Sequence, residues 1–104
     1  MQIRLLKEKI GDPDKFIRRC GYGQLINRRT GEKNYVHRCG PLLYPRFHVY
    51  IKEESAGFVF NLHLDQRQPI YAGVTAHSGE YDGEVVEREG ERIKNMAENY
   101  LSGN

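Results

Sequence analysis

Residues 47–65, FHVYIKEESAGFVFNLHLD, hold two stretches in which every second side chain is apolar, separated by a short polar turn. The apolar positions are Phe47, Val49, Ile51, Phe58, Phe60, Leu62 and Leu64. Such alternation is typical of two antiparallel strands that bury one common face, here at 47–53 and 58–65. Because a slip of one residue would turn every apolar side chain to the wrong face, the predicted register sets Phe47 opposite Leu64 and continues in steps of two.

A third strand is predicted at 69–75, after a second polar turn at 65–68. Pro69 is compatible with the start of a strand, where it need not donate to the ladder. The same rule of a shared apolar face gives the expected pairs Leu64–Ile70, Leu62–Ala72 and Phe60–Val74. The sequence therefore predicts an antiparallel meander of three strands.

Two helices are predicted, at 12–20 and at 82–101. The Asp12 side chain can accept a hydrogen bond from a backbone amide in the first turn of the helix. Pro13 suits the first helical position, because the amide hydrogen that proline lacks would have no partner within the helix. The C-terminal segment places an apolar stripe at helical spacing, which should pack on one face of the sheet. The stripe comprises Val86, Gly90, Ile93, Ala97 and Leu101. The charged run at 84–89 is interpreted as a solvated face of this helix.

The rest of the chain adds shorter elements. Residues 1–10 fit a strand through the alternation of Ile3 and Leu5 and fit a helix equally well through the spacing of Ile3, Leu6 and Ile10, and of the two we favour a short strand. Residues 23–38 favour a hairpin whose turn contains Gly31. We therefore expect an α+β fold with a mainly antiparallel sheet of four to six strands. The length of 104 residues fits one domain, 1–104, which buries roughly 65% of its unfolded surface.

Composition excludes several classes of protein. With 38% hydrophobic and 29% charged residues and no long apolar run, the sequence predicts neither disorder nor a membrane span. The start of the chain lacks the apolar core of a secretory signal, so we expect a cytoplasmic protein with reduced thiols at Cys20 and Cys39. The glycines around Tyr22 lack the Lys and Ser or Thr of a phosphate loop, and we predict no cofactor.

The net charge of +2 hides an asymmetry between the two halves of the chain. Residues 1–52 hold 12 Lys and Arg against 4 Asp and Glu, whereas residues 53–104 hold 4 against 10. The halves therefore carry +8 and −6. Such a distribution is typical of a phosphate-binding surface, or of two halves that neutralise each other or a dimer partner.

The polar face of the meander gathers residues that can carry chemistry. The predicted register sets His48 opposite His63 and His63 opposite Tyr71, with Asp65 two positions along on the same face. These four residues are the candidates for a general base or a two-histidine, one-carboxylate metal site. The alternative interpretation is a solvated polar face, which an antiparallel sheet has by default.

Two other combinations are disfavoured by geometry or spacing. In the predicted register His77 lies opposite Gly57 and roughly 20 Å from His63, too far for a shared site with Asp65. Cys20, His37 and Cys39 lack the close cysteine pair of a structural zinc site, so we predict no metal.

The basic first half supports the leading functional hypothesis, a binding module that contacts RNA or DNA. The proposed contact residues are Arg18, Arg19, Arg28, Arg29, Lys33, Arg38, Arg46 and Tyr35. No sequence signature of an established RNA-binding module is present. A small enzyme or ligand-binding protein that uses the histidine patch is the second hypothesis, and a protein–protein adaptor or homodimer is the third.

Overall fold

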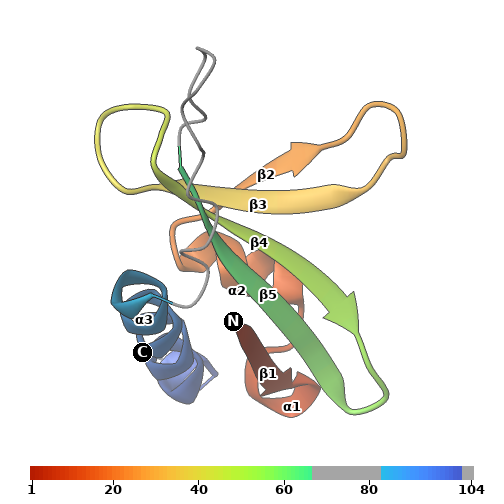
Figure 1. Ribbon diagram of the computed structural model, residues 1–104. Coiled ribbons are helices and arrows are strands. Elements are labelled where there is room, and N and C mark those ends of the chain that lie inside the picture. The colour runs from red at the N-terminus through yellow and green to blue at the C-terminus, as the bar shows by residue number, and fades with distance from the viewer. Residues whose placement is uncertain (67–82, 102–104) are drawn as a thin grey trace.

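The computed structural model describes residues 1–66 and 83–101, which form an antiparallel sheet with helices along one face (Figure 1). The strands are β1 (Gln2–Leu6), β2 (Gly23–Ile26), β3 (Lys33–Arg38), β4 (Arg46–Glu53) and β5 (Gly57–Asp65). The helices are α1 (Lys7–Ile10), α2 (Pro13–Arg19) and α3 (Glu84–Tyr100). The strand order is β1-β5-β4-β3-β2, and each neighbouring pair is antiparallel. The predicted α+β fold is confirmed.

The hairpin of β4 and β5 has the register that the alternation predicted. Phe47 pairs with Leu64, and His48 pairs with His63. The hairpin of β2 and β3 is also present, with Gly31 at a φ of 76° in its turn. This left-handed conformation explains why a glycine stands there.

The strand that pairs with the second edge of β5 is not the predicted one. Ile3 of β1 pairs with Phe60, at the position that the sequence assigned to Val74, and Leu6 pairs with Gly57. The expected pairing of Phe60 with Val74 is therefore wrong, because a strand has only two edges and β4 occupies the other. The predicted strand 69–75 itself lies outside the described residues.

The close packing of β1 against β5 requires a glycine at position 57. A Cβ atom at Gly57 would collide with the backbone carbonyl of Leu5. The absence of a side chain therefore lets β1 approach β5 closely at the start of the strand.

Both predicted helices are present, and a further single turn, α1, follows β1. Asp12 caps α2 by accepting a hydrogen bond of 2.9 Å from the Asp14 amide, with Pro13 at the first position. α3 buries Val86, Ile93 and Ala97 of the predicted stripe.

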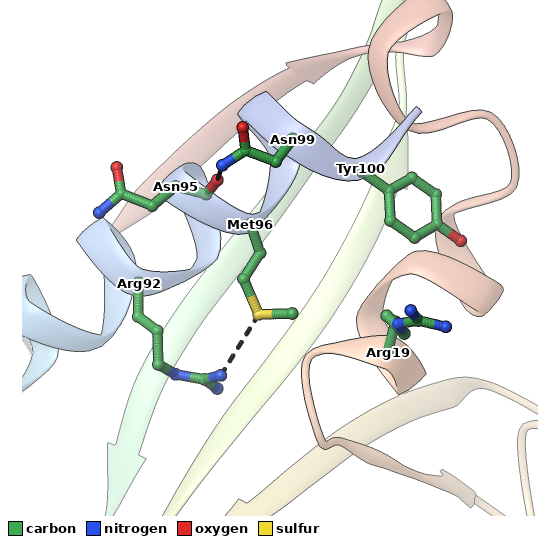
Figure 2. Close-up of a pocket in the computed structure, with 6 residues that line it drawn as sticks. All are labelled: Arg19, Arg92, Asn95, Met96, Asn99 and Tyr100. Atoms are coloured by element: carbon green, nitrogen blue, oxygen red, sulfur yellow. Dashed lines mark hydrogen bonds between the residues drawn. The ribbon is translucent and has the colours of Figure 1, made fainter. Parts of the chain in front are cut away.

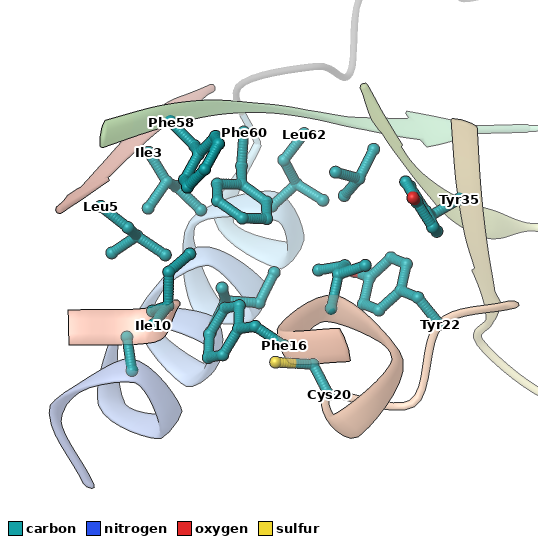
Figure 3. Close-up of a cluster of buried hydrophobic side chains, with 14 of the residues drawn as sticks. Ile3, Leu5, Ile10, Phe16, Cys20, Tyr22, Tyr35, Phe58, Phe60 and Leu62 are labelled. Atoms are coloured by element: carbon teal, nitrogen blue, oxygen red, sulfur yellow. The ribbon is translucent and has the colours of Figure 1, made fainter. Parts of the chain in front are cut away.

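The core lies between these helices and one face of the sheet (Figure 3). Phe16 of α2 is fully buried, and its ring packs edge-on against Phe60 of β5 at 5.9 Å and Tyr100 of α3 at 5.1 Å. Burial of aromatic side chains of this size dominates the stability of a small core. None of the described helices covers the opposite face, and none is long and apolar enough to cross a membrane.

Candidate functional site

The sheet face without a helix, called here the open face, is built by alternation along β4 and β5. The alternate residues that point away from the core are Arg46, His48, Tyr50 and Lys52 on β4, and Val59, Asn61, His63 and Asp65 on β5. Neighbouring strands add Gln2 and Arg4 from β1 and Asn34, Val36 and Arg38 from β3. The open face is therefore rich in cationic and aromatic side chains.

His48 is fixed by hydrogen bonds from both of its ring nitrogens. Nδ1 lies 2.8 Å from Oδ2 of Asp65, and Nε2 lies 2.7 Å from Oδ1 of the buried Asn34. This contact joins β3, β4 and β5 through one ring. Both ring nitrogens of His48 are therefore engaged in contacts within the protein.

Tyr50 lies between the two histidines. Its ring centroid is 4.7 Å from that of His48 and 6.1 Å from that of His63. These three rings, with Met1 and Asp65, line an open hollow of about 340 Å³. Tyr50 remains 36% exposed, so part of its ring is accessible to a ligand.

Arg46 lies next to the same hollow, because it contacts Asp65, which lines the hollow. Its Nε lies 3.6 Å from Oδ2 of Asp65, and its guanidinium carbon lies 4.6 Å from the centre of the Tyr44 ring. Arg38 is paired with Arg46 in the β3–β4 register and is exposed. Two arginines thus lie opposite each other on adjacent strands at one end of the open face.

The turn between β2 and β3 presents a second group of cations. Arg28, Arg29 and Lys33 are exposed and form no ion pair with any described residue. The side chain of Asn27 orders this turn by accepting hydrogen bonds from the amides of Arg29 at 2.9 Å and Thr30 at 3.2 Å. The backbone that carries these cations is therefore held in place.

Three other residues proposed to contact nucleic acid lie elsewhere. Tyr35 is 5% exposed and donates a hydrogen bond of 2.7 Å to Asp14, so the prediction that its ring stacks on a base is wrong. Its pairing with Val49 places it on the core face. Arg18 forms an ion pair with Asp14 at 2.9 Å, and Arg19 lies on α2, which covers the core face.

The candidate metal ligands are not grouped together in the described part of the chain. No group of three or more His, Cys, Asp or Glu side chains within residues 1–66 and 83–101 is placed to hold a metal ion. Tyr71 and His77 lie outside the described residues. The predicted position of His77 opposite Gly57 is occupied by Leu6.

The two cysteines are free and differ in environment. Burial raises the pKa of the Cys20 thiol to about 11, whereas Cys39 is exposed. His37 donates a hydrogen bond of 2.8 Å from Nδ1 to the carbonyl of Gly21 and stacks on Tyr22. Cys20, His37 and Cys39 therefore differ in burial and in the groups that they contact.

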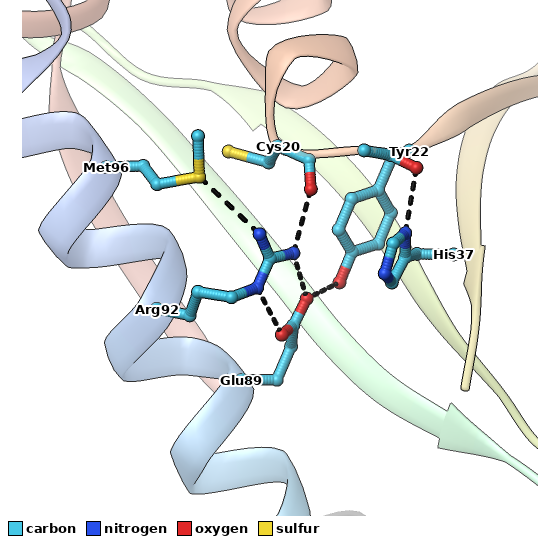
Figure 4. A network of polar contacts seen from close by, with 7 residues as sticks. Cys20, Tyr22, His37, Glu89, Arg92 and Met96 are labelled. Atoms are coloured by element: carbon cyan, nitrogen blue, oxygen red, sulfur yellow. Dashed lines mark hydrogen bonds and ion pairs between the residues drawn. The ribbon is translucent and has the colours of Figure 1, made fainter. Parts of the chain in front are cut away.

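A buried polar network under α3 was missed by the sequence analysis (Figure 4). Glu89 is 7% exposed and accepts hydrogen bonds from the Tyr22 hydroxyl at 2.6 Å and from two nitrogens of Arg92 at 2.7 and 2.8 Å. Burial opposes ionisation of Glu89, but the Arg92 and Tyr22 hydrogen bonds outweigh it and lower the pKa of its carboxyl. Burial and the Glu89 carboxylate raise the pKa of Tyr22.

The prediction that the whole run 84–89 is a solvated helix face is therefore wrong at Glu89. Glu89 follows Val86 by three residues and precedes Ile93 by four, so it lies on the buried stripe. That spacing is the signal in the sequence that could have identified it.

A second hollow, of about 330 Å³, lies between α2 and α3 on the helical side of the molecule (Figure 2). It is lined by Arg19, Arg92, Asn95, Met96, Asn99 and Tyr100. Its six side chains come from α2 and α3.

The two charged halves of the chain neutralise each other only in part. Lys9 of α1 contacts Glu98 of α3 at 2.7 Å, and this is the one ion pair between the basic half and α3 within the described residues. The acidic groups of α3 instead pair mostly within their own helix, as Arg88 does with Glu84. The cations of the β2–β3 turn are therefore not covered by the acidic helix.

Comparisons of the chain with protein-family models, with curated proteins and with solved structures returned no match.

Proposed function

We propose that the protein binds single-stranded nucleic acid on the open face of the sheet. The observation that carries this proposal is the hollow around Tyr50, where an accessible aromatic ring stands between two imidazoles. Proteins that bind single strands commonly stack unpaired bases on such rings, because every base has a π face. An unpaired base enters the hollow and stacks against Tyr50.

The cations around the hollow supply contacts to the phosphates. Arg46 and Lys52 lie on either side of Tyr50 along β4, roughly 20 Å apart at about 3.3 Å per residue. Arg38 stands beside Arg46, and Arg28 and Arg29 extend the basic surface at the β2–β3 turn. A strand that crosses the face therefore meets positive charge before and after the aromatic hollow.

The hydrogen bonds of His48 give the site its rigidity. Since Asp65 and Asn34 fix the His48 ring, the neighbouring Tyr50 ring has a fixed surface to pack on. A preorganised aromatic platform costs less conformational entropy when a base stacks on it.

Binding of fluorescently labelled single-stranded RNA and DNA of mixed sequence, measured by anisotropy at several salt concentrations, tests the proposal. We expect affinity to fall with salt, with a log–log slope of about −0.7 for each phosphate that a cation neutralises. Lys52→Gln should reduce both the affinity and this slope. The matched control is Lys15→Gln, an exposed lysine of α2, the helix that covers the core face.

Substitution of the central ring separates stacking from charge. Tyr50→Leu should weaken binding by roughly tenfold, as expected for loss of one stacked base, whereas Tyr50→Phe should bind as the unmodified protein does. Absence of binding at low salt would overturn the proposal. Equal losses for Lys52→Gln and Lys15→Gln would also overturn it, because they would show a diffuse charge effect.

The homodimer hypothesis stays a prediction, and the mass in solution tests it. The exposed edge strand β2, with Leu25 and Ile26 accessible, is the surface on which a second copy would pair.

A further inference from the structure

The hollow between α2 and α3 is lined by hydrogen-bond donors and apolar groups but by no acidic side chain (Figure 2). Two of its six lining residues, Arg19 and Arg92, are cationic, and two more, Asn95 and Asn99, carry amides. Met96 and Tyr100 supply apolar surface. Such a lining favours an anionic group attached to a small apolar body.

Arg92 has one guanidinium nitrogen without a strong acceptor. Its Nε and Nη2 donate to Glu89, and Nη2 also donates to the carbonyl of Cys20 at 2.8 Å (Figure 4). Its Nη1 contacts the thioether sulfur of Met96 at 3.5 Å. Sulfur is a weak acceptor, so a carboxylate oxygen at this position would form the stronger bond.

The same contacts hold the Arg92 side chain in place. Bonds to Glu89 and to Cys20 fix the plane of the guanidinium, so Nη1 is presented without further ordering. Because Glu89 already balances the charge of Arg92, a bound anion needs a second cation. Arg19 is exposed and forms no ion pair with a described residue, and it supplies that charge.

We propose that this hollow binds the carboxylate of a small aryl- or alkyl-carboxylic acid, between Arg92 Nη1 and Arg19. The apolar body of the ligand lies against Met96 and the Tyr100 ring, which the edge contact with Phe16 holds in place. A carboxylate is favoured over a phosphate because Glu89 already balances the charge of Arg92, which leaves Arg19 as the one uncompensated cation lining the hollow and so matches a singly charged group. This site does not depend on the open face of the sheet.

Nuclear magnetic resonance of the full chain labelled with ¹⁵N tests the proposal directly. Titration with 3-phenylpropionate should shift the side-chain amide signals of Asn95 and Asn99, with a Kd on the order of 1 mM. The neutral probe 3-phenylpropanamide should leave these signals in place. Inorganic phosphate is the third probe, and it should bind more weakly than the carboxylate.

Variants decide whether the Arg19 contact contributes to the binding. Arg19→Gln should weaken 3-phenylpropionate binding about tenfold, whereas Lys15→Gln on the same helix should not change it. Met96→Leu should retain binding, since the proposal uses Met96 only as an apolar wall. Equal binding of the neutral amide, tighter binding of phosphate, or an unchanged affinity of Arg19→Gln would each overturn the proposal.

Discussion

The hydroxyl of Tyr22 donates a hydrogen bond of 2.6 Å to the carboxylate of Glu89, a residue 67 positions later in the chain. This bond ties the segment before β2 to the N-terminal half of α3. Arg92 completes the contact by binding both oxygens of the same carboxylate and the backbone of Cys20. A charged group thus holds the C-terminal helix onto the rest of the fold.

Replacement of this carboxylate should destabilise the protein. Glu89→Gln keeps the shape but removes the charge that Arg92 and Tyr22 satisfy, and we expect a loss of about 1–3 kcal/mol in the free energy of unfolding. Urea denaturation measures this change. Glu87→Gln, an exposed position on the same helix, is the control and should have little effect. Equal stability of the two variants would contradict the structural role of Glu89.

The stability of the protein should decline in acid. The pKa of Glu89 is lowered in the folded state, so the unfolded chain binds more protons as the pH falls below about 5. The stabilisation is complete above the unfolded pKa and is lost as the pH passes down through the folded pKa. Asp14, whose pKa is lowered chiefly by the Tyr35 hydrogen bond, acts in the same direction.

The urea midpoint, measured from pH 7 to pH 3, checks this dependence. Glu89→Gln should reduce the slope without abolishing it, since Asp14 remains. A slope that is identical in the unmodified protein and in Glu89→Gln would show that Glu89 is not linked to folding.

The two thiols should react at very different rates. Since burial raises the pKa of Cys20 to about 11, this thiol is both protonated and inaccessible near pH 8, whereas Cys39 is exposed. A disulfide reagent should therefore modify one thiol rapidly in the native protein and the second only after unfolding. Cys39→Ser should eliminate the rapid phase; a rapid phase that survives this change would contradict the burial of Cys20.

Substitution at Gly57 should separate β1 from β5. Gly57→Ala places a Cβ against the Leu5 carbonyl, and we expect a cost of about 1–3 kcal/mol because backbone must move. Gly40→Ala is the matched control, since a Cβ there meets no atom within 4 Å. Thermal unfolding compares the two variants, and a Gly57→Ala protein as stable as Gly40→Ala would refute the close approach.

Local patterns predicted much of the fold. The register of β4 and β5 follows from strict alternation on both sides of a short turn, so Phe47 and Leu64 could be paired directly. α3 follows from its apolar stripe. The start of α2 follows from Asp12 and Pro13, whose capping roles depend only on neighbouring residues.

The errors concern contacts between distant segments. Ile3 and Val74 are equally suitable apolar partners for Phe60, and only the three-dimensional path of the chain brings β1 to that edge. The partner of His48 on β3, Asn34, was missed because the register across the long β3–β4 connection is not determined by a tight turn. The same missing register explains why the burial of Tyr35 does not follow from the sequence.

From the strand order β1-β5-β4-β3-β2 we also expect a particular order of events in folding. β1 finds its partner only when residues 57–61 are available, although β2, β3 and β4 can pair successively through adjacent hairpins. Such a long-range closure is entropically costly, and it delays the final step relative to the local ones. During synthesis β1 therefore cannot pair until β5 has been made, and β5 then completes the described sheet by entering between β4 and β1.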